Sequence, residues 1–159
     1  MKKLTIEIKW SFIYIIIALF WILFEKLLGL HDQYIDKHPI YSSLFVIPSI
    51  IVYIFALKDK KKNFYNGNMN WKQGFLTGIT ISLIIAVLSP LSQYISNNYI
   101  SPDFLENASQ YAVKMKMMTV EGAKNYFNLR SYIIQSAFGA LSFGVVNAAI
   151  VAYFLQNKK

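Results

Sequence analysis

Long apolar stretches alternate with short charged segments along the whole chain. Four of these stretches contain almost no charge, at about residues 10–30, 39–57, 71–95 and 131–155. A transmembrane helix needs about 20 mostly apolar residues, because each residue advances the helix by about 1.5 Å. The pattern therefore predicts an all-α protein: a polytopic membrane bundle of four transmembrane helices, forming a single domain over residues 1–159.

The first apolar stretch shares one feature with secretory signal peptides, because Lys2 and Lys3 precede it. Its apolar run is longer than a usual signal core, however, and Glu25-Lys26 follows it where a small-residue cleavage site would be needed. We therefore expect this stretch to be retained as the first membrane helix.

The basic residues divide unequally between the two sides that four spans would create. Ten fall on the side of the chain ends and of the segment between spans two and three, against six on the other side. Cytoplasmic loops of membrane proteins collect Lys and Arg. We therefore expect both termini to be cytoplasmic. The ten are Lys2, Lys3, Lys9, Lys58, Lys60, Lys61, Lys62, Lys72, Lys158 and Lys159.

The long segment between spans three and four has a helical pattern of its own. Ser101-Pro102 is typical of an N-cap followed by proline in the first turn. Thr119 can cap a second short helix. We expect short amphipathic helices over about residues 101–128, lying on the outer membrane surface or covering the bundle, or acting as a lid or partner-binding face. The apolar stripe comprises Phe104, Ala108, Tyr111, Met115 and Met118, widened by Leu105 and Ala112.

Small residues recur every four positions in spans three and four. Such stripes allow two helix backbones to approach closely in a membrane, where lipid offers no hydrophobic drive for association. We expect them to pack on each other or, for one of them, on a second copy of the chain. Pro90 should kink the third span. The stripes are Gly74, Gly78, Ser82 and Ala86, and Ser136, Ala140, Gly144 and Ala148.

A group of ionisable residues lies at the outer end of the first span. Ionisable groups within a membrane are costly and mark candidate functional positions. Here they offer candidate ligands for a divalent metal, or a proton relay, although their spacing matches no H-E-x-x-H motif. The alternative is structural: Glu25 pairs with Lys26, Lys37 or Arg130, and the histidines face a wet interface. The candidates are Glu25, His31, Asp32 and His38.

Composition narrows the possible functions further. Charged residues make up only 15% of the chain and cysteine is absent, which excludes disulfides and thiolate metal sites. The net charge of +8 is explained by topology, so we expect no nucleic acid partner. We assign no cofactor. The basic run Lys58, Lys60, Lys61 and Lys62 could contact anionic lipid head groups.

Three stretches carry a resemblance to a known family: Phe24–Asp32, Trp71–Phe75 and Ser89–Tyr94. In these the chain resembles uncharacterised bacterial membrane proteins grouped as domain of unknown function 4199. The resemblance implies a multi-helix protein of the inner (cytoplasmic) membrane, found mainly in the Bacteroidota. It implies no activity and supplies no catalytic residues.

Three functional hypotheses follow. The first is a non-enzymatic accessory or interaction component of the membrane, working as a homo-oligomer or with a membrane partner protein. The second is a small transporter or ion-handling protein that uses Glu25 and the Pro90 kink, with an aqueous path lined also by Gln93 and Gln135. The third is a membrane metalloenzyme whose metal is held by the four candidate ligands. Enzymatic activity is left open, with the balance against it.

Overall fold

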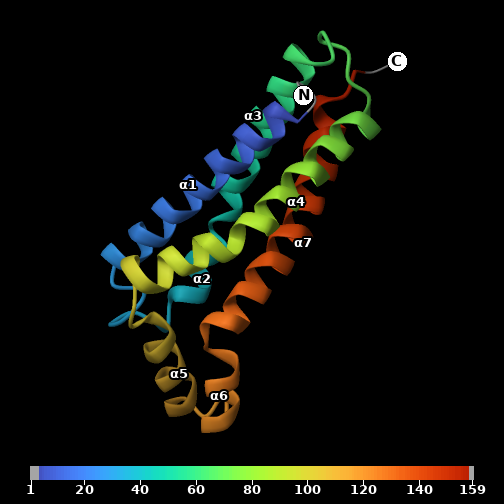
Figure 1. The fold of residues 1–159 in the computed structure, drawn as a ribbon. Helices are drawn as coiled ribbons and strands as arrows, with labels where there is room; N and C mark the ends of the chain where they lie inside the picture. The colour runs from blue at the N-terminus through green and yellow to red at the C-terminus, as the bar shows by residue number, and fades with distance from the viewer. Residues whose placement is uncertain (1–3, 158–159) are drawn as a thin grey trace.

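The computed structural model describes residues 4–157, which form helices joined by short turns. Four helical segments in this part of the chain are long and apolar enough to cross a membrane. Figure 1 shows them as one elongated bundle. The predicted all-α membrane bundle is therefore confirmed. The segments are α1 (Thr5–Leu27), α2 (His38–Ser43) with α3 (Val46–Asn63), α4 (Trp71–Ile95) with the π-helix η1 (Ser96–Ile100), and α7 (Leu129–Leu155).

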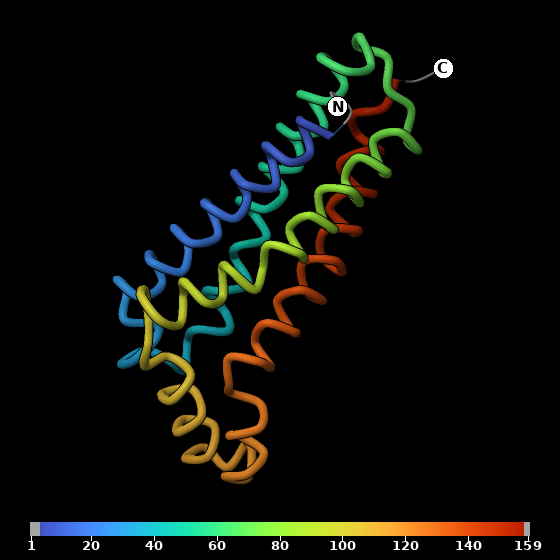
Figure 2. The backbone as a smooth tube through the Cα atoms, in the orientation of Figure 1, coloured from blue at the N-terminus to red at the C-terminus, as the bar shows by residue number. Residues whose placement is uncertain are grey.

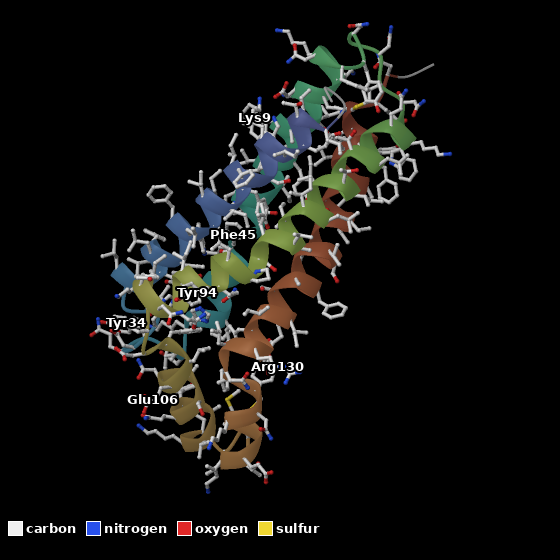
Figure 3. The ribbon with its side chains drawn as sticks, viewed as in Figure 1. Lys9, Tyr34, Phe45, Tyr94, Glu106 and Arg130 are labelled. Carbon is white, nitrogen blue, oxygen red and sulfur yellow. The ribbon has the colours of Figure 1, made fainter. Side chains whose placement is uncertain are left out.

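The bundle has two distinct ends. At the basic end lie the start of α1, the α3–α4 loop and the end of α7 (Figure 1). At the opposite, distal end lie the turn between α1 and α2 and the two short helices α5 (Phe104–Lys114) and α6 (Val120–Tyr126). Figure 3 places Lys9 toward the basic end and Glu106 and Arg130 at the distal end. Lys2, Lys3, Lys158 and Lys159, which count toward the expected orientation, lie outside the described residues.

Two helix bounds differ from the sequence expectation by more than three residues. Helix α1 begins at Thr5 rather than near residue 10, and α3 continues through the basic run to Asn63, so that this run is helical rather than part of a loop. The second span is also interrupted between α2 and α3. Pro48 has no N–H and its ring crowds the carbonyl four residues earlier. That Leu44 carbonyl accepts instead from the Ile47 N–H at 3.0 Å, a tighter turn that breaks the helix.

Pro90 lies within α4 without ending it. Its missing N–H would leave the Ala86 carbonyl unpaired, but the Ser89 hydroxyl donates to that oxygen at 2.8 Å. Beyond Ile95 the helix widens into η1, and Ser101 N–H donates to the Ser96 carbonyl at 2.8 Å.

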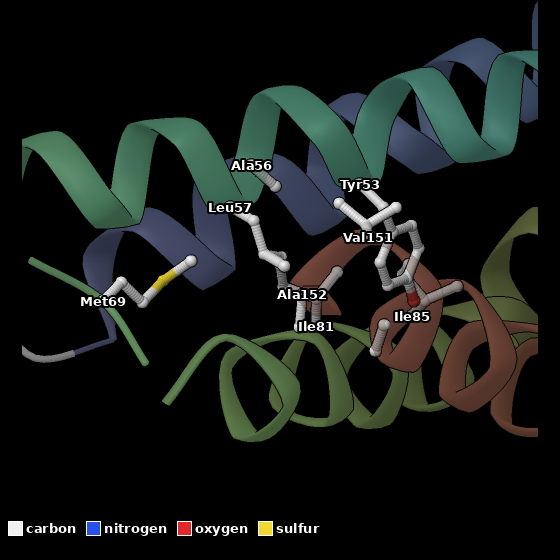
Figure 4. Close-up of a cluster of buried hydrophobic side chains, with 9 residues drawn as sticks. Tyr53, Ala56, Leu57, Met69, Ile81, Ile85, Val151 and Ala152 are labelled. Atoms are coloured by element: carbon white, nitrogen blue, oxygen red, sulfur yellow. The ribbon is translucent and has the colours of Figure 1, made fainter. Parts of the chain in front are cut away.

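The hydrophobic core fills the half of the bundle nearer the basic end. It lies between α3, α4 and α7 (Figure 4), and Ala56, Leu57, Ile81 and Ala152 in it are 0% exposed. This half is therefore closely packed. The full cluster comprises Tyr53, Ala56, Leu57, Met69, Ile81, Ile85, Ala148, Val151 and Ala152.

The two small-residue stripes face each other in this half. A side-chain carbon added at Gly74 would lie 3.0 Å from the Ala152 Cβ, and one at Gly78 would lie 3.0 Å from the Ala148 Cα. Both distances are shorter than ordinary van der Waals contact, so the backbones of α4 and α7 approach as closely as glycine permits. One turn further on, Gly144 lies against Ser82.

The stripes separate toward the distal end. Ala86, Ser136 and Ala140 are only half-buried, and the tube in Figure 2 shows the distal half of α7 diverging from α4. Hydrogen bonds between helices lie near the point of divergence. The Tyr53 hydroxyl is 2.7 Å from the Ser82 hydroxyl. Close packing therefore gives way to a more open, more polar half.

Charged side chains join α1 to α3 at the basic end. Lys60 Nζ lies 2.7 Å from Glu7 Oε1, and both residues are buried. Lys9 pairs with Asp59, which also accepts from Trp10 Nε1 at 2.7 Å. Buried pairs of this kind satisfy charges that a membrane span could not leave exposed to lipid.

These contacts reduce the set of lysines that can meet lipid head groups. Lys60 is 2% exposed, and Lys61 Nζ donates to the Leu155 carbonyl at 2.7 Å. Lys58 and Lys62 are exposed, so contact with anionic lipid stays a prediction for these two.

The α4–α7 contact predicts that a single methyl group destabilises the fold at Gly78 but not at Gly139. Gly78→Ala places a carbon against Ala148, and overpacking of this kind costs about 1–3 kcal/mol. Nothing lies within 4 Å of a carbon added at Gly139, on the same pair of helices. Thermal unfolding of the two variants in detergent should therefore show a lower melting temperature for Gly78→Ala alone. Equal melting temperatures would contradict the close contact.

Candidate metal centre

The turn that follows α1 positions the first two site residues. Gly29 has φ +74°, a left-handed conformation that glycine adopts without strain. Its N–H donates to the Lys26 carbonyl at 2.9 Å, and the next N–H, of Leu30, donates to the Glu25 carbonyl at 3.0 Å. These two bonds form a Schellman motif, which ends the helix and reverses the chain. The reversal brings His31, which follows the helix, back toward Glu25 near the end of α1.

Three side chains converge at this turn. Glu25 Oε2 lies 3.6 Å from His31 Nε2 and 3.8 Å from His38 Nε2. His38 is the first residue of α2. One possible ligand atom from each side chain lies within 4.8 Å of the other two. Glu25 is 2% and His31 4% exposed. The cluster is therefore a buried group of one carboxylate and two imidazoles at the distal end of a membrane helix.

Neighbouring groups hold two of these side chains through their other polar atoms. Trp21 Nε1, one turn earlier on α1, donates to Glu25 Oε1 at 2.8 Å. The Ser101 hydroxyl lies 2.9 Å from His31 Nδ1. These contacts leave Glu25 Oε2 and His31 Nε2 as the atoms that face each other.

Helix α5 covers the two imidazoles. The Phe104 ring lies 4.7 Å from the His31 ring and 4.8 Å from the His38 ring, between centroids. Asn107, also on α5, donates from Nδ2 to the His31 carbonyl at 3.0 Å. The start of the expected amphipathic helix therefore lies directly over the candidate ligands, whereas Met115 and Met118 of its predicted apolar stripe are exposed.

A small cavity of about 150 Å³ adjoins the cluster and is lined by all three side chains. Asn97 and Gln93 contribute to the same wall from η1 and α4. Asn97 Oδ1 is buried there without a hydrogen-bond partner among the described residues. A buried acceptor of this kind can accept from a water molecule coordinated to a metal.

The arrangement fits a divalent transition metal. Zinc binds imidazole nitrogen and carboxylate oxygen at about 2.0–2.2 Å, so two ligand atoms of a tetrahedral site lie roughly 3.4 Å apart. The two distances from Glu25 Oε2 are close to that separation. Two histidines and one glutamate form a known zinc ligand set, with the fourth position open to water. The Ser101 contact to His31 is the kind of second hydrogen bond that orients a metal-bound imidazole.

The structure brings together three of the four residues singled out from the sequence. Asp32, the fourth, is exposed, and its carboxylate accepts from the Gln33 N–H, so it does not join the cluster. The expected wet interface is wrong for His31, which is buried.

The lysines proposed as partners of Glu25 are also engaged elsewhere. Lys26 Nζ donates to the Ile100 carbonyl, and Lys37 lies 5.0 Å from the centre of the Tyr34 ring. Arg130, the third proposed partner, is exposed. Within residues 4–157, the polar partners of the Glu25 carboxylate are therefore Trp21 and the two histidines.

Several residues of the site could not be recognised from the sequence. Ser101 was interpreted as a helix cap, but α5 begins at Phe104, with Asp103 in the capping position, and the Ser101 hydroxyl contacts His31. Trp21 stands four residues before Glu25, a spacing that places both on one helix face. That spacing was the one available signal. Thr119, by contrast, caps α6 as expected, since it accepts from the Gly122 N–H at 3.1 Å.

A larger cavity of about 540 Å³ lies beside the candidate site, between α1, α3, α4 and α7. The two cavities share wall residues, among them His38, Ser42 and Gln93. The larger one extends toward the middle of the bundle as far as Ser49 and Asn147, which are joined by a 2.8 Å hydrogen bond. Gln135, expected to line an aqueous path with Glu25 and Gln93, is exposed instead.

Comparison with known proteins identifies a family but no characterised relative. No curated protein matches this chain, and no solved structure matches it. One family matches residues 9–157, a range that includes all four candidate spans almost completely as well as the cluster at the distal end. The chain belongs to this family, which is described as Protein of unknown function (DUF4199).

Proposed function

We propose that this protein is a metal-binding protein of the bacterial inner membrane, with both termini in the cytoplasm. A divalent transition metal of the zinc class binds on the outer side through Glu25, His31 and His38. The observation that carries the proposal is the convergence of three ligand atoms within 4.8 Å of one another, with both distances from Glu25 Oε2 close to the edge of a tetrahedral site.

The distances favour metal coordination over a simple carboxylate–imidazole ion pair. A charge-assisted N–H···O bond draws its two atoms to about 2.7–2.9 Å. Glu25 Oε2 lies 3.6 Å from His31 Nε2 and 3.8 Å from His38 Nε2, both well beyond that range. A carboxylate oxygen that faces two imidazole nitrogens at these lengths is arranged for a shared central ion.

Binding is better supported than transport across the membrane. Glu25 and Gln93 do line one cavity, as the transport hypothesis requires. The third residue of the expected path, Gln135, is exposed on α7. Toward the basic end the space between the helices is filled by the hydrophobic core. The polar region is therefore a pocket that ends within the bundle, which suits an accessory protein that holds a ligand at one face.

The orientation is supported by the distribution of basic residues. The basic end carries Lys58 and Lys62 as exposed charges, and the positive-inside rule assigns such an end to the cytoplasm. Four spans then return the C-terminus to the side of the N-terminus, and place His31 and His38 on the outer side.

Zinc titration tests the candidate site directly. We expect the purified full-length protein in detergent to bind one zinc ion, and His31→Ala and His38→Ala to weaken this binding by at least 100-fold. Glu25→Gln should have a similar effect, because it removes the anionic ligand. Ser101→Ala should weaken binding by roughly 10–100-fold, because it removes the hydrogen bond that orients His31. Competition with a chromophoric chelator measures each affinity.

Asp32→Asn is the matched control for that titration, because Asp32 lies on the same turn but outside the cluster. It should bind zinc like the unmodified chain. The proposal fails if the four ligand and neighbour variants bind zinc as tightly as the control, provided that all of them unfold at similar temperatures.

Single-cysteine labelling tests the orientation, and the absence of native cysteine makes it simple. Lys62→Cys at the basic end should be protected from a membrane-impermeant maleimide in intact bacterial cells. Glu121→Cys on α6 should react, since it is exposed at the distal end. Permeabilised cells should label both. The reverse pattern in intact cells would overturn the assignment of the cytoplasmic side.

A further inference from the structure

The larger cavity occupies the distal half of the membrane-spanning region. Its walls run along α4 from Ile85 to Gln93, a separation of eight positions that corresponds to about 12 Å of helix. At about 540 Å³ it falls within the range of pockets that hold small organic ligands. A pocket of this size between membrane helices is surrounded by lipid hydrocarbon rather than by water.

Exposed side chains at the rim indicate where the cavity opens. Val46 on α3 and Phe143 on α7 both line it, and they are 41% and 64% exposed. Pro39 and Ser43, on α2, are exposed members of the same wall. The opening therefore lies between α2–α3 and the diverging half of α7, and it faces sideways toward the bilayer.

Several polar residues in the wall are already hydrogen-bonded within the protein. The hydroxyls of Ser89 and Ser136 donate to carbonyls of their own helices, Ala86 at 2.8 Å and Ile133 at 2.9 Å. Asn147 donates to Ser49 across the bundle. Because these groups are already hydrogen-bonded, the wall is better suited to an apolar chain than to a row of water molecules.

Gly139 keeps space open in this wall. It lines the cavity, and a carbon added there would meet nothing within 4 Å. Glycine in the interior of a helix costs about 1 kcal/mol relative to alanine. At Gly78 and Gly144 close helix contact accounts for that cost, whereas at Gly139 the effect of the missing side chain is to leave room within the pocket.

The open cavity leads to the candidate metal centre. His38 belongs to both cavities, and Ile22, Ser42 and Gln93 form the rest of the shared wall. An amphiphile lying in the larger cavity would therefore place its polar head at the smaller one, where Glu25, His31 and His38 converge.

We propose that the larger cavity binds one acyl chain of a membrane lipid, with an anionic oxygen of the lipid head as the fourth ligand of the metal. The proposal rests on the proposed metal site for its polar end and on the lateral opening for its apolar end. A carboxylate or a phosphate head offers the same chemistry, because both supply an oxygen that a zinc-class ion accepts.

Photo-crosslinking identifies the occupant. The full-length protein, loaded with zinc in phosphatidylcholine nanodiscs, is irradiated with a fatty acid that carries a diazirine midway along its chain. A second arm uses the same chain in phosphatidic acid, so that the two arms distinguish a carboxylate from a phosphate head. Mass spectrometry should find labels enriched several-fold on Ala18 and Ile85 over the lipid-facing Val87. Chelation of the zinc should reduce that enrichment.

Variants that fill the cavity provide the specific test. Gly139→Leu and Ala18→Phe, on opposite walls, should each lower the cavity labelling several-fold, while the melting temperature and the zinc affinity in lipid-free detergent, where water fills the fourth position, stay unchanged. Val87→Leu adds the same kind of group at a position that is 78% exposed and should have no effect.

Three outcomes would overturn the lipid proposal. The first is labelling of Ala18 and Ile85 no stronger than that of Val87. The second is labelling that persists in both filled variants. The third is labelling that does not change when zinc is removed, which would separate the chain from the metal. In the first two cases, zinc binding by the same protein would leave the proposed function standing. If instead the unmodified protein does not bind zinc, that result contradicts the metal centre itself.

Discussion

The close approach of α4 and α7 at Gly74 and Gly78 is the contact on which the rest of the structure depends. In a membrane, association between helices must come from packing and hydrogen bonds, because lipid is as apolar as the helix surfaces. Glycine facing alanine allows the two backbones to come together along the basic half of the bundle. The buried core of α3, α4 and α7 then forms around that contact.

The same contact explains why the distal half is open. Toward the distal end the stripe residues Ala86, Ser136 and Ala140 are only half-buried, and α7 leaves α4 toward the α5–α6 helices. The larger cavity forms in the space between them. At its far end the Schellman turn at Gly29 returns His31 over Glu25, while α5 covers both histidines with Phe104. A closely packed half and an open half that ends at the candidate ligands thus arise from one divergence of α4 and α7.

Features that depend on local periodicity could be predicted from the sequence, whereas those that depend on tertiary placement could not. The spans follow from apolar length, and the third was placed at residues 71–95, where α4 lies. The break at Leu44 and Phe45 could not be foreseen, because prolines bend some membrane helices and interrupt others. Glu25 and the two histidines were identified by their cost in a membrane. Asp32 was included wrongly and Ser101 was assigned to a cap, because a turn of the chain decides which side chains face inward.

The central claim is that Glu25, His31 and His38 coordinate one metal ion, and X-ray absorption at the zinc edge tests it most directly. The zinc-loaded, full-length protein should show a four-coordinate ion with two imidazole nitrogens and two oxygens at about 2.0–2.1 Å. The imidazole scattering should fall by half in His38→Ala. A six-coordinate spectrum of oxygen ligands alone, unchanged by that substitution, would contradict the account.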